Sequence, residues 1–447
     1  MQQTRAKLKE VKITAKRGDR DAMIQLLDHS VSCGHERLSI RRYFMAHALG
    51  AGRLDAFRPH CRAAASGIMA DELLGIARNA TQYIANGKRV HEMTAELLSP
   101  TVPGILSYDN VYPQLKTGVR FCGGGSCIIG KTKIGANAAL GPGVVIRADG
   151  HIVEAGDDFC IGQNSTVHIA HGVLPTFIGN RVTVGRNVVV HACTVGDDCV
   201  IDDDAVVLDG SVIESGVIVE PGAIVFPRST LRSGHVYGGC PAKVVREVQP
   251  DEIATRAKNI REAIAASVCM SFAGERADVA AYPDACFVAS NAHLSGRVEL
   301  KSRSSIFFSC NLRAGKSSIV VGRNTNVQDN TVIECSGDGV TIGDDTTIGH
   351  NVFIHDCQIG NKSLIGIGSL LSGGTIIEND VLVAAGAVTR PNQRLESGWI
   401  WGGRPARPIA KLDDSKRAMM SEIIGHYCSY GEAYHAVQKS PSHWRIP

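Results

Sequence analysis

The chain has 447 residues, which is too long for one small domain because domains commonly hold about 100–200 residues. Hydrophobic residues make up 44% and charged residues 20%, a balance that excludes a disordered chain. Lys and Arg outnumber Asp and Glu by 47 to 44, so the charge gives no reason to expect nucleic acid or an anionic membrane as partner. No apolar stretch reaches the ~18 residues that span a bilayer, and residues 1–17 lack the apolar segment of a signal peptide. We therefore expect a cytoplasmic protein.

In chain order, residues 1–100 favour helices, with helical spacing over 8–27 and 70–98. Aliphatic residues then recur at six-residue steps over about 118–230 and again over about 286–390. Helical spacing returns over 251–267 and 413–437. The first hexad series includes Ile161, Val167, Val173, Ile178, Val184 and Val190, and the second includes Ile342, Ile348, Ile354, Ile359, Ile365 and Leu371.

A period of six fits neither an amphipathic helix nor a long alternating strand. It predicts very short strands joined by tight turns, with one aliphatic side chain per side pointing into a narrow core. The pattern resembles the left-handed parallel β-helix of hexapeptide-repeat proteins. We therefore predict a mainly β fold of tandem left-handed β-helices, with a helical N-terminal region and a helix after each β-helix.

The two hexad regions are copies of one another. The motif Ser-Gly-x-x-x-Gly-Gly-x-Pro-Ala occurs at 233–242 and at 397–406, an offset of 397 − 233 = 164 residues. His191 and His355 share that offset, so the duplication carries no net insertion between these points. The predicted domains are a helical region at 1–100, β-helices at 101–248 and 286–412, a helical linker at 249–285 and a C-terminal helix at 413–447.

The second copy resembles a narrower group, the γ-class carbonic anhydrases, in three short motifs. These are Asn326-Val327-Gln328-Asp329, Ile348-Gly349-His350 and His355-Asp356-Cys357. The resemblance implies one metal ion, zinc or iron, held by three histidines at an interface between subunits of a trimer. It also implies an Arg, a Gln and an Asp close to that metal.

Carried over to the second copy, the resemblance marks His350, His355, Arg313, Gln328 and Asp329 as candidate catalytic residues. His350 and His355 match two of the metal ligands. The third ligand position holds Glu334 instead of histidine, so the candidate metal set is Glu334, His350 and His355.

Carried over to the first copy, the resemblance matches Arg147 and Asp149, and His191 matches one ligand. Arg186 stands where a second histidine is expected. The third position is ambiguous: the offset of 164 gives Ala170, flanked by His168 and His171, and the local sequence favours His168. His168 and His191 form the candidate metal set of this copy.

For the assembly, the resemblance implies a homotrimer in which like β-helices stack on like. In that arrangement His350 of one subunit approaches Glu334 and His355 of another, and the first copy is structural. The alternative is a junction between unlike copies. One such junction gathers His168 or His171 with His191 and His350, and the other pairs Arg186 with Glu334. A ring of three cannot alternate two types, which counts against the mixed junction.

Three functions are compatible with these residues. The first is transfer of an acyl group from CoA or a carrier protein to a small-molecule or sugar acceptor, with a histidine as general base; this prediction rests on fold-level analogy. The second is a metal-dependent hydratase or hydrolase of the γ-carbonic anhydrase type, with zinc or iron as cofactor. The third is a non-catalytic trimeric scaffold. Expected partners are further copies of the chain and a small-molecule substrate.

Overall fold

The structure is a computed structural model that describes residues 11–15, 19–49, 104–122, 124–266, 287–438 and 444–445, with isolated residues between 54 and 80. The chain forms two compact units, residues 1–102 with 266–273 and residues 103–265 with 274–447. In the first unit lie α2 (Arg20–Ser32), α3 (Glu36–Ala48) and the short η1 (Leu54–Ala56). The helix predicted over 8–27 is divided, because α2 begins afresh at Arg20 with Asp19 as its N-cap. Nearly all of the predicted helix at 70–98 lies outside the described residues.

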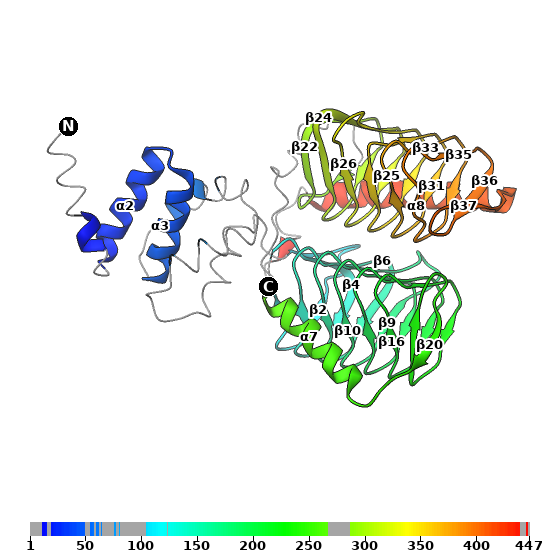
Figure 1. Ribbon diagram of the computed structural model, residues 1–447, viewed down its shortest axis with the longest axis horizontal. Helices are drawn as coiled ribbons and strands as arrows, with labels where there is room; N and C mark the ends of the chain where they lie inside the picture. Colours follow the sequence, from blue (N-terminus) through cyan, green and yellow to red (C-terminus); the bar gives the residue numbers. More distant parts are fainter. Residues whose placement is uncertain are drawn as a thin grey trace. The chain divides into compact units, whose positions relative to one another are not determined.

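The second unit contains two β-helices of parallel strands that lie side by side (Figure 1). The first has strands β1 (Gly104–Leu106), β2 (Gln114–Leu115), β3 (Arg120–Phe121), β4 (Cys127–Ile134), β5 (Ala139–Leu140), β6 (Val145–Ala155), β7 (Cys160–Ile161), β8 (Thr166–His168), β9 (Thr176–Ile178), β10 (Thr183–Val184), β11 (Val189–His191), β12 (Thr194–Val195), β13 (Val200–Ile201), β14 (Val206–Val207), β15 (Val212–Ile213), β16 (Ile218–Val219), β17 (Ile224–Val225), β18 (Thr230–Leu231), β19 (His235–Gly238) and β20 (Lys243–Glu247).

The second β-helix repeats this plan. Its strands are β21 (Phe287–Val288), β22 (His293–Leu300), β23 (Ser305–Ile306), β24 (Asn311–Val321), β25 (Asn326–Val327), β26 (Val332–Glu334), β27 (Val340–Ile342), β28 (Thr347–Ile348), β29 (Phe353–His355), β30 (Gln358–Ile359), β31 (Leu364–Ile365), β32 (Leu370–Leu371), β33 (Ile376–Ile377), β34 (Leu382–Val383), β35 (Arg394–Leu395), β36 (Trp399–Gly402) and β37 (Arg407–Lys411). The short β38 (Trp444–Arg445) pairs antiparallel with β1. In each β-helix one long strand, β6 or β24, pairs with strands on two faces.

The hexad residues form the two cores. Ile161, Val167, Val184 and Ile348 are buried, as are the equivalent aliphatic residues of neighbouring coils. The prediction was wrong for Val173, whose exposed fraction is 71%. This residue sits in a turn closed by backbone hydrogen bonds between Ala170 and Leu174, which takes the chain out of the coil before β9 begins.

One helix covers one face of each β-helix. Helix α7 (Glu252–Ala266) places Ile260 and Ile264 against apolar residues of the first. Helix α8 (Asp414–Gln438) lies along strands β21, β23, β25 and β28 of the second. The two helices match the predictions at 251–267 and 413–437 to within one residue at each end. Among the described helices, none is long and apolar enough to cross a membrane.

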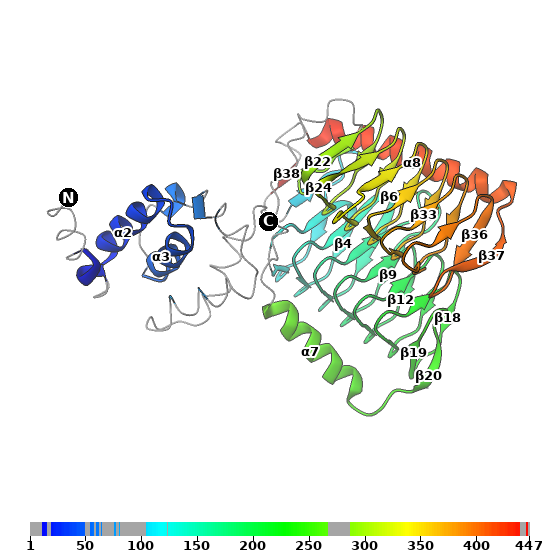
Figure 2. The same cartoon turned by 45° about the horizontal axis from the view of Figure 1, so that its top comes forward.

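The two β-helices pack directly against each other with their coils alongside (Figure 2). Asn351 donates from Nδ2 to Oδ1 of Asn187 at 2.8 Å, although the two asparagines are equivalent residues 164 positions apart. Along the same seam, Ile367 and Ala385 pack on an apolar cluster that includes Val206. The seam joins one face of the first β-helix to one corner of the second.

Candidate metal centre at the junction of the two β-helices

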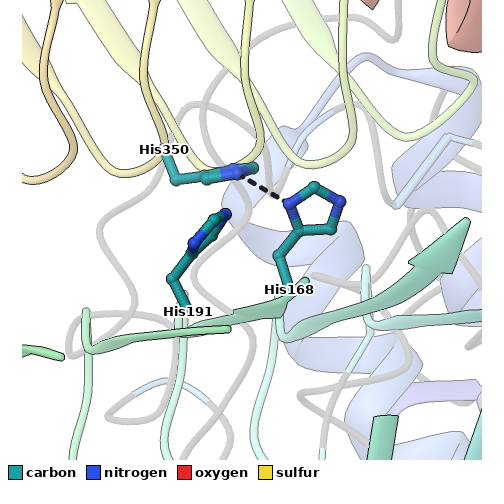
Figure 3. Close-up of side chains that lie close together, drawn as sticks. All are labelled: His168, His191 and His350. Carbon is teal, nitrogen blue, oxygen red and sulfur yellow. Dashed lines mark hydrogen bonds between the residues drawn. The ribbon is translucent and has the colours of Figure 1, made fainter. Parts of the chain in front are cut away.

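Three histidines from both β-helices converge at this seam (Figure 3). His168 ends β8 and His191 ends β11 on the next coil, and strand pairing sets the two side by side. His350 follows β28 and reaches across from the second β-helix, with Nε2 3.2 Å from Nδ1 of His168. One ring nitrogen from each of the three lies within 4.8 Å of the others. Among the described residues, this is the one group of three or more His, Cys, Asp or Glu side chains arranged to share an ion.

Each of these histidines has an aspartate beside its other ring nitrogen. His168 Nε2 lies 3.0 Å from Oδ1 of Asp149. His191 Nδ1 lies 2.5 Å from Oδ1 of Asp209, and His350 Nδ1 lies 3.2 Å from Oδ2 of Asp329. A carboxylate in this place fixes the tautomer and orientation of an imidazole, and metal-binding histidines commonly have one.

Arg147 joins the aspartates from the two β-helices. Its guanidinium is fully buried, donates from Nε to Oδ2 of Asp329 at 3.0 Å, and forms an ion pair with Asp149. Burial alone lowers the pKa of Arg147, but the Asp149 and Asp329 carboxylates outweigh it and the net pKa is raised. Burial likewise opposes ionisation of both aspartates, yet Arg147 holds the pKa of each below its ordinary value. All three groups are therefore charged at neutral pH.

The histidines beside this ion cluster are neutral. Burial, followed by the charge of Arg147, lowers the pKa of His168 to about 3. Burial lowers the pKa of His350 to about 4, although the neighbouring Asp329 opposes the shift. Because the neutral imidazole is the form that binds metal, both rings are ready to act as ligands at pH 7.

Helix α8 closes the cluster from the side with a stripe of tyrosines. Tyr434 donates from its hydroxyl to Oδ2 of Asp149 at 2.8 Å, and the hydroxyl of Tyr427 lies 3.3 Å from His350 Nε2. The Arg147 guanidinium lies over the rings of Tyr427, Tyr430 and Phe307 at 5.0–5.4 Å from their centroids. These contacts exclude bulk water and strengthen the electrostatic interactions inside.

The residues predicted from the sequence divide between two places. Asp329 and His350 lie in the junction cluster with Arg147, Asp149, His168 and His191. Gln328 directly precedes Asp329 and is buried, and its Nε2 donates to Oδ1 of Asn326. Glu334 and His355 pair on β26 and β29, at a different face of the second β-helix. Glu334 forms an ion pair with Arg313, and both side chains are about one-third exposed. Within one chain, His350 does not come together with Glu334 and His355.

Strand register resolves the ambiguous position in the first copy. His168 pairs with His191 in the first β-helix, just as Glu334 pairs with His355 in the second. The equivalent of Glu334 is therefore His168 rather than Ala170 or His171. Arg186, the equivalent of His350, is exposed and pairs with Asp203 at 2.8 Å. His171 lies outside the cluster, with Nδ1 2.6 Å from the hydroxyl of Tyr430.

Sequence reasoning missed Asp209 and the roles of Tyr427 and Tyr434. Asp209 lies one coil after His191, where the second copy has Gly373 at the same offset of 164. Comparing the copies at that offset would have found it. The tyrosines follow a helical step that predicts packing alone, and their hydroxyl contacts depend on how α8 is placed.

The donor set fits a divalent cation. Three imidazoles are the ligands that zinc accepts in open tetrahedral sites, and iron also binds them. The buried charges leave an excess of one negative charge, because Asp149 and Asp329 face a single Arg147. A cation among the histidines would offset that excess.

No family profile matches the sequence. Among curated proteins, the mitochondrial γ carbonic anhydrase 1 of Arabidopsis thaliana is 36% identical over 162 residues, covering 35% of this chain and 59% of that protein. The YrdA protein of Escherichia coli is 34% identical over 131 residues, covering 28% of this chain and 71% of that protein. Among solved structures, a hexapeptide transferase family protein of Anaplasma phagocytophilum is 30% identical with a TM-score of 0.33, covering 37% of this chain and 95% of that one.

The coils and the sequence likenesses define a hexapeptide-repeat protein. More narrowly, the chain belongs to the γ-carbonic-anhydrase-like branch of the left-handed β-helix proteins. The chain spans about three-fifths of the length of the plant relatives it matches.

Proposed function

We propose that the chain binds one divalent ion, zinc or iron, through His168, His191 and His350, and acts as a hydratase or hydrolase of the γ-carbonic anhydrase type on a small substrate. The observation that carries this proposal is the set of three aspartates, one beside each histidine. Histidines that only pack between the two β-helices would not each require a carboxylate beside the ring. Such a set orients three rings toward one point.

A divalent ion held by three imidazoles lowers the pKa of water at its open position and supplies a nucleophile near neutral pH. The chain's own residues prepare that site. Asp149 and Asp209 hold the rings of His168 and His191 with one nitrogen turned inward, and Asp329 lies beside Nδ1 of His350. Arg147 fixes two of the three aspartates, so it positions ligands from both β-helices at once.

The test is metal analysis and a CO2 hydration assay on purified protein and on two matched variants. His191→Ala should lose both metal and activity, because it removes one ligand. His355→Ala alters the equivalent residue of the other copy and should keep both. Loss of metal from His355→Ala with retention by His191→Ala would instead place the ion at Glu334, His350 and His355 between chains. Wild-type protein with neither metal nor hydration activity would contradict this proposal and leave acyl transfer and the scaffold as the remaining functions.

The other predictions from the sequence have no comparable support among the described residues. Acyl transfer from acyl-CoA remains a prediction, and His171 and His355 are the candidate bases that the junction cluster does not use. The homotrimer and the cytoplasmic location also remain predictions. The plant relatives are named as mitochondrial proteins, and that name describes those proteins rather than this chain.

A further inference from the structure

A further pair of histidines meets between the first β-helix and helix α8. His171 lies in the turn closed by backbone hydrogen bonds between Ala170 and Leu174, and His426 lies on α8. The centroids of the two rings are 4.4 Å apart, and the ring planes are inclined by 38°. Neither ring belongs to the junction cluster of three histidines. The pair therefore lies outside the site proposed above.

The turn that carries His171 is longer than its counterpart in the second copy. Strand register makes His168 equivalent to Glu334 and Ile178 equivalent to Ile342. The step from His168 to Ile178 is 178 − 168 = 10 residues, whereas the step from Glu334 to Ile342 is 342 − 334 = 8. The first copy thus has two additional residues in the turn that leaves the coil and reaches α8.

Tyr430 and Gly150 fix the place of the His171 ring. The hydroxyl of Tyr430 lies 2.6 Å from Nδ1 of His171. Burial, followed by the charge of Asp149, raises the pKa of Tyr430, so this hydroxyl stays protonated. A Cβ atom at Gly150 would lie 2.2 Å from Nδ1 of His171, so a larger residue there would displace the ring. Because the tyrosine engages Nδ1, Nε2 is the ring nitrogen that His171 can offer to an ion.

A carboxylate lies beside the other ring. Glu422 precedes His426 by four residues and shares its face of α8, with Oε1 4.0 Å from Nε2 of the histidine. The Glu422 side chain is 71% exposed, so it can turn toward both rings without disturbing the core. Burial, followed by His171, lowers the pKa of His426, although Glu422 opposes the shift. His426 is therefore neutral at pH 7, which is the form of histidine that binds metal.

We propose that His171, His426 and Glu422 bind a second divalent ion, with zinc as the expected metal. Two imidazoles and one carboxylate are a donor set that zinc accepts. The two rings already lie together, and the exposed carboxylate completes the set by rotation about its own bonds. An ion held here joins the first β-helix to α8, the helix whose Tyr427 and Tyr434 contact the junction cluster. The site shares no ligand with the junction cluster, so it does not depend on the function proposed above.

The test is titration of chelator-treated protein with zinc. Because His171 is exposed, an ion at this site should exchange faster than one at the junction, so dialysed protein keeps only the junction ion and titration counts both. We expect two zinc equivalents in the wild type and one in either His171→Ala or His426→Ala. Glu422→Gln should keep both equivalents but bind the second less tightly. His235→Ala alters a histidine on β19 whose Nδ1 lies 2.8 Å from a backbone oxygen, and it should keep both.

His191→Ala separates this site from the junction. It should lose the junction equivalent and keep the one that His426→Ala removes. If the junction binds no zinc, the wild type should bind a single equivalent, which His191→Ala keeps and His426→Ala loses. Failure of the function proposed above is thereby distinguished from failure of this site.

Two outcomes would overturn the proposal. One is an equal number of zinc equivalents in the wild type and in His426→Ala. The other is a zinc-loaded crystal whose anomalous scattering shows no ion between His171 and His426. Hydrogen exchange is a further readout, because amides of α8 should exchange more slowly once the second equivalent binds, and His426→Ala should not show this change. Circular dichroism of each variant separates loss of zinc from loss of folding.

Discussion

Nδ1 of His191 lies 2.5 Å from Oδ1 of Asp209, an aspartate one coil further along the first β-helix. In the second β-helix the equivalent residues are His355 and Gly373. Because Gly373 has no side chain, His355 has no carboxylate at the position that Asp209 occupies beside His191. His355 instead has Nε2 2.9 Å from the hydroxyl of Ser336. The two copies have therefore diverged at the aspartate beside this histidine as well as at the proposed ligand positions.

This contact predicts that Asp209→Asn weakens metal binding without removing a ligand. We expect an affinity about 10–100-fold lower, because the amide no longer favours the ring orientation that metal binding needs. Titration of metal-free protein with zinc measures the change. Asp198→Asn alters an exposed aspartate paired with Arg181 in the same β-helix and should bind as the wild type does. Equal affinities for all three proteins would contradict the role of Asp209.

Arg147 predicts a large loss of stability on substitution. Arg147→Met leaves Asp149 and Asp329 buried without their cation, and breaking a buried pair in this way costs about 3–5 kcal/mol. Arg313 is the equivalent residue of the other copy, where it pairs with Glu334, which is about one-third exposed. Arg313→Met should cost about 0–1 kcal/mol, as exposed pairs do. Urea unfolding compares the two. A similar loss of unfolding free energy in both variants would show that burial of the Arg147 cluster does not increase the cost of removing the cation.

The lowered histidine pKa values predict that metal-free protein loses stability in mild acid. In the folded chain the pKa of His168 is about 3 and that of His350 about 4, against about 6.5 when unfolded. Below pH 6.5 the unfolded chain therefore binds protons that the folded chain does not. The free energy of unfolding falls as pH drops toward 4, by at most about 1.4 kcal/mol per pH unit for each histidine.

Unfolding midpoints of chelator-treated protein at pH 7 and pH 5 measure this slope. The variant His350→Gln lacks one of the two groups, so its slope should be shallower whatever its absolute stability. Equal stability at both pH values would show that the histidines titrate alike in both states. Added zinc should raise the stability at pH 7, since an ion that binds only the folded chain stabilises it.

The hexad pattern predicts opposite results for two residues of one series. Ile161→Ala opens a cavity in the first core and should cost about 2–5 kcal/mol. Val173→Ala changes an exposed side chain in the turn before β9, so its effect should stay within about 0.5 kcal/mol. Thermal or urea unfolding distinguishes them. A cost for Val173→Ala as large as that for Ile161→Ala would place Val173 in the core.

The sequence by itself determined the coils and their duplication. A side chain at every sixth position, such as Ile342 and Ile348, points inward because strand length and turn chemistry repeat locally. Helical spacing of the apolar residues located α7 and α8, one after each β-helix. The hexad pattern placed Val173 in the core wrongly, because a six-residue step cannot reveal a turn that leaves the coil. The resemblance likewise located His350, Asp329 and Arg147, each within its own copy.

The tertiary structure alone decided which of these residues meet. His168 and His350 are 182 residues apart, and no local spacing relates them. Their contact arises because a face of the first β-helix docks on a corner of the second, which depends on complementary surfaces rather than on the coil repeat. Each copy judged separately has an incomplete set of ligands. Joined at the seam, His168 and His191 from one copy and His350 from the other form the three-histidine set that we propose as the metal site.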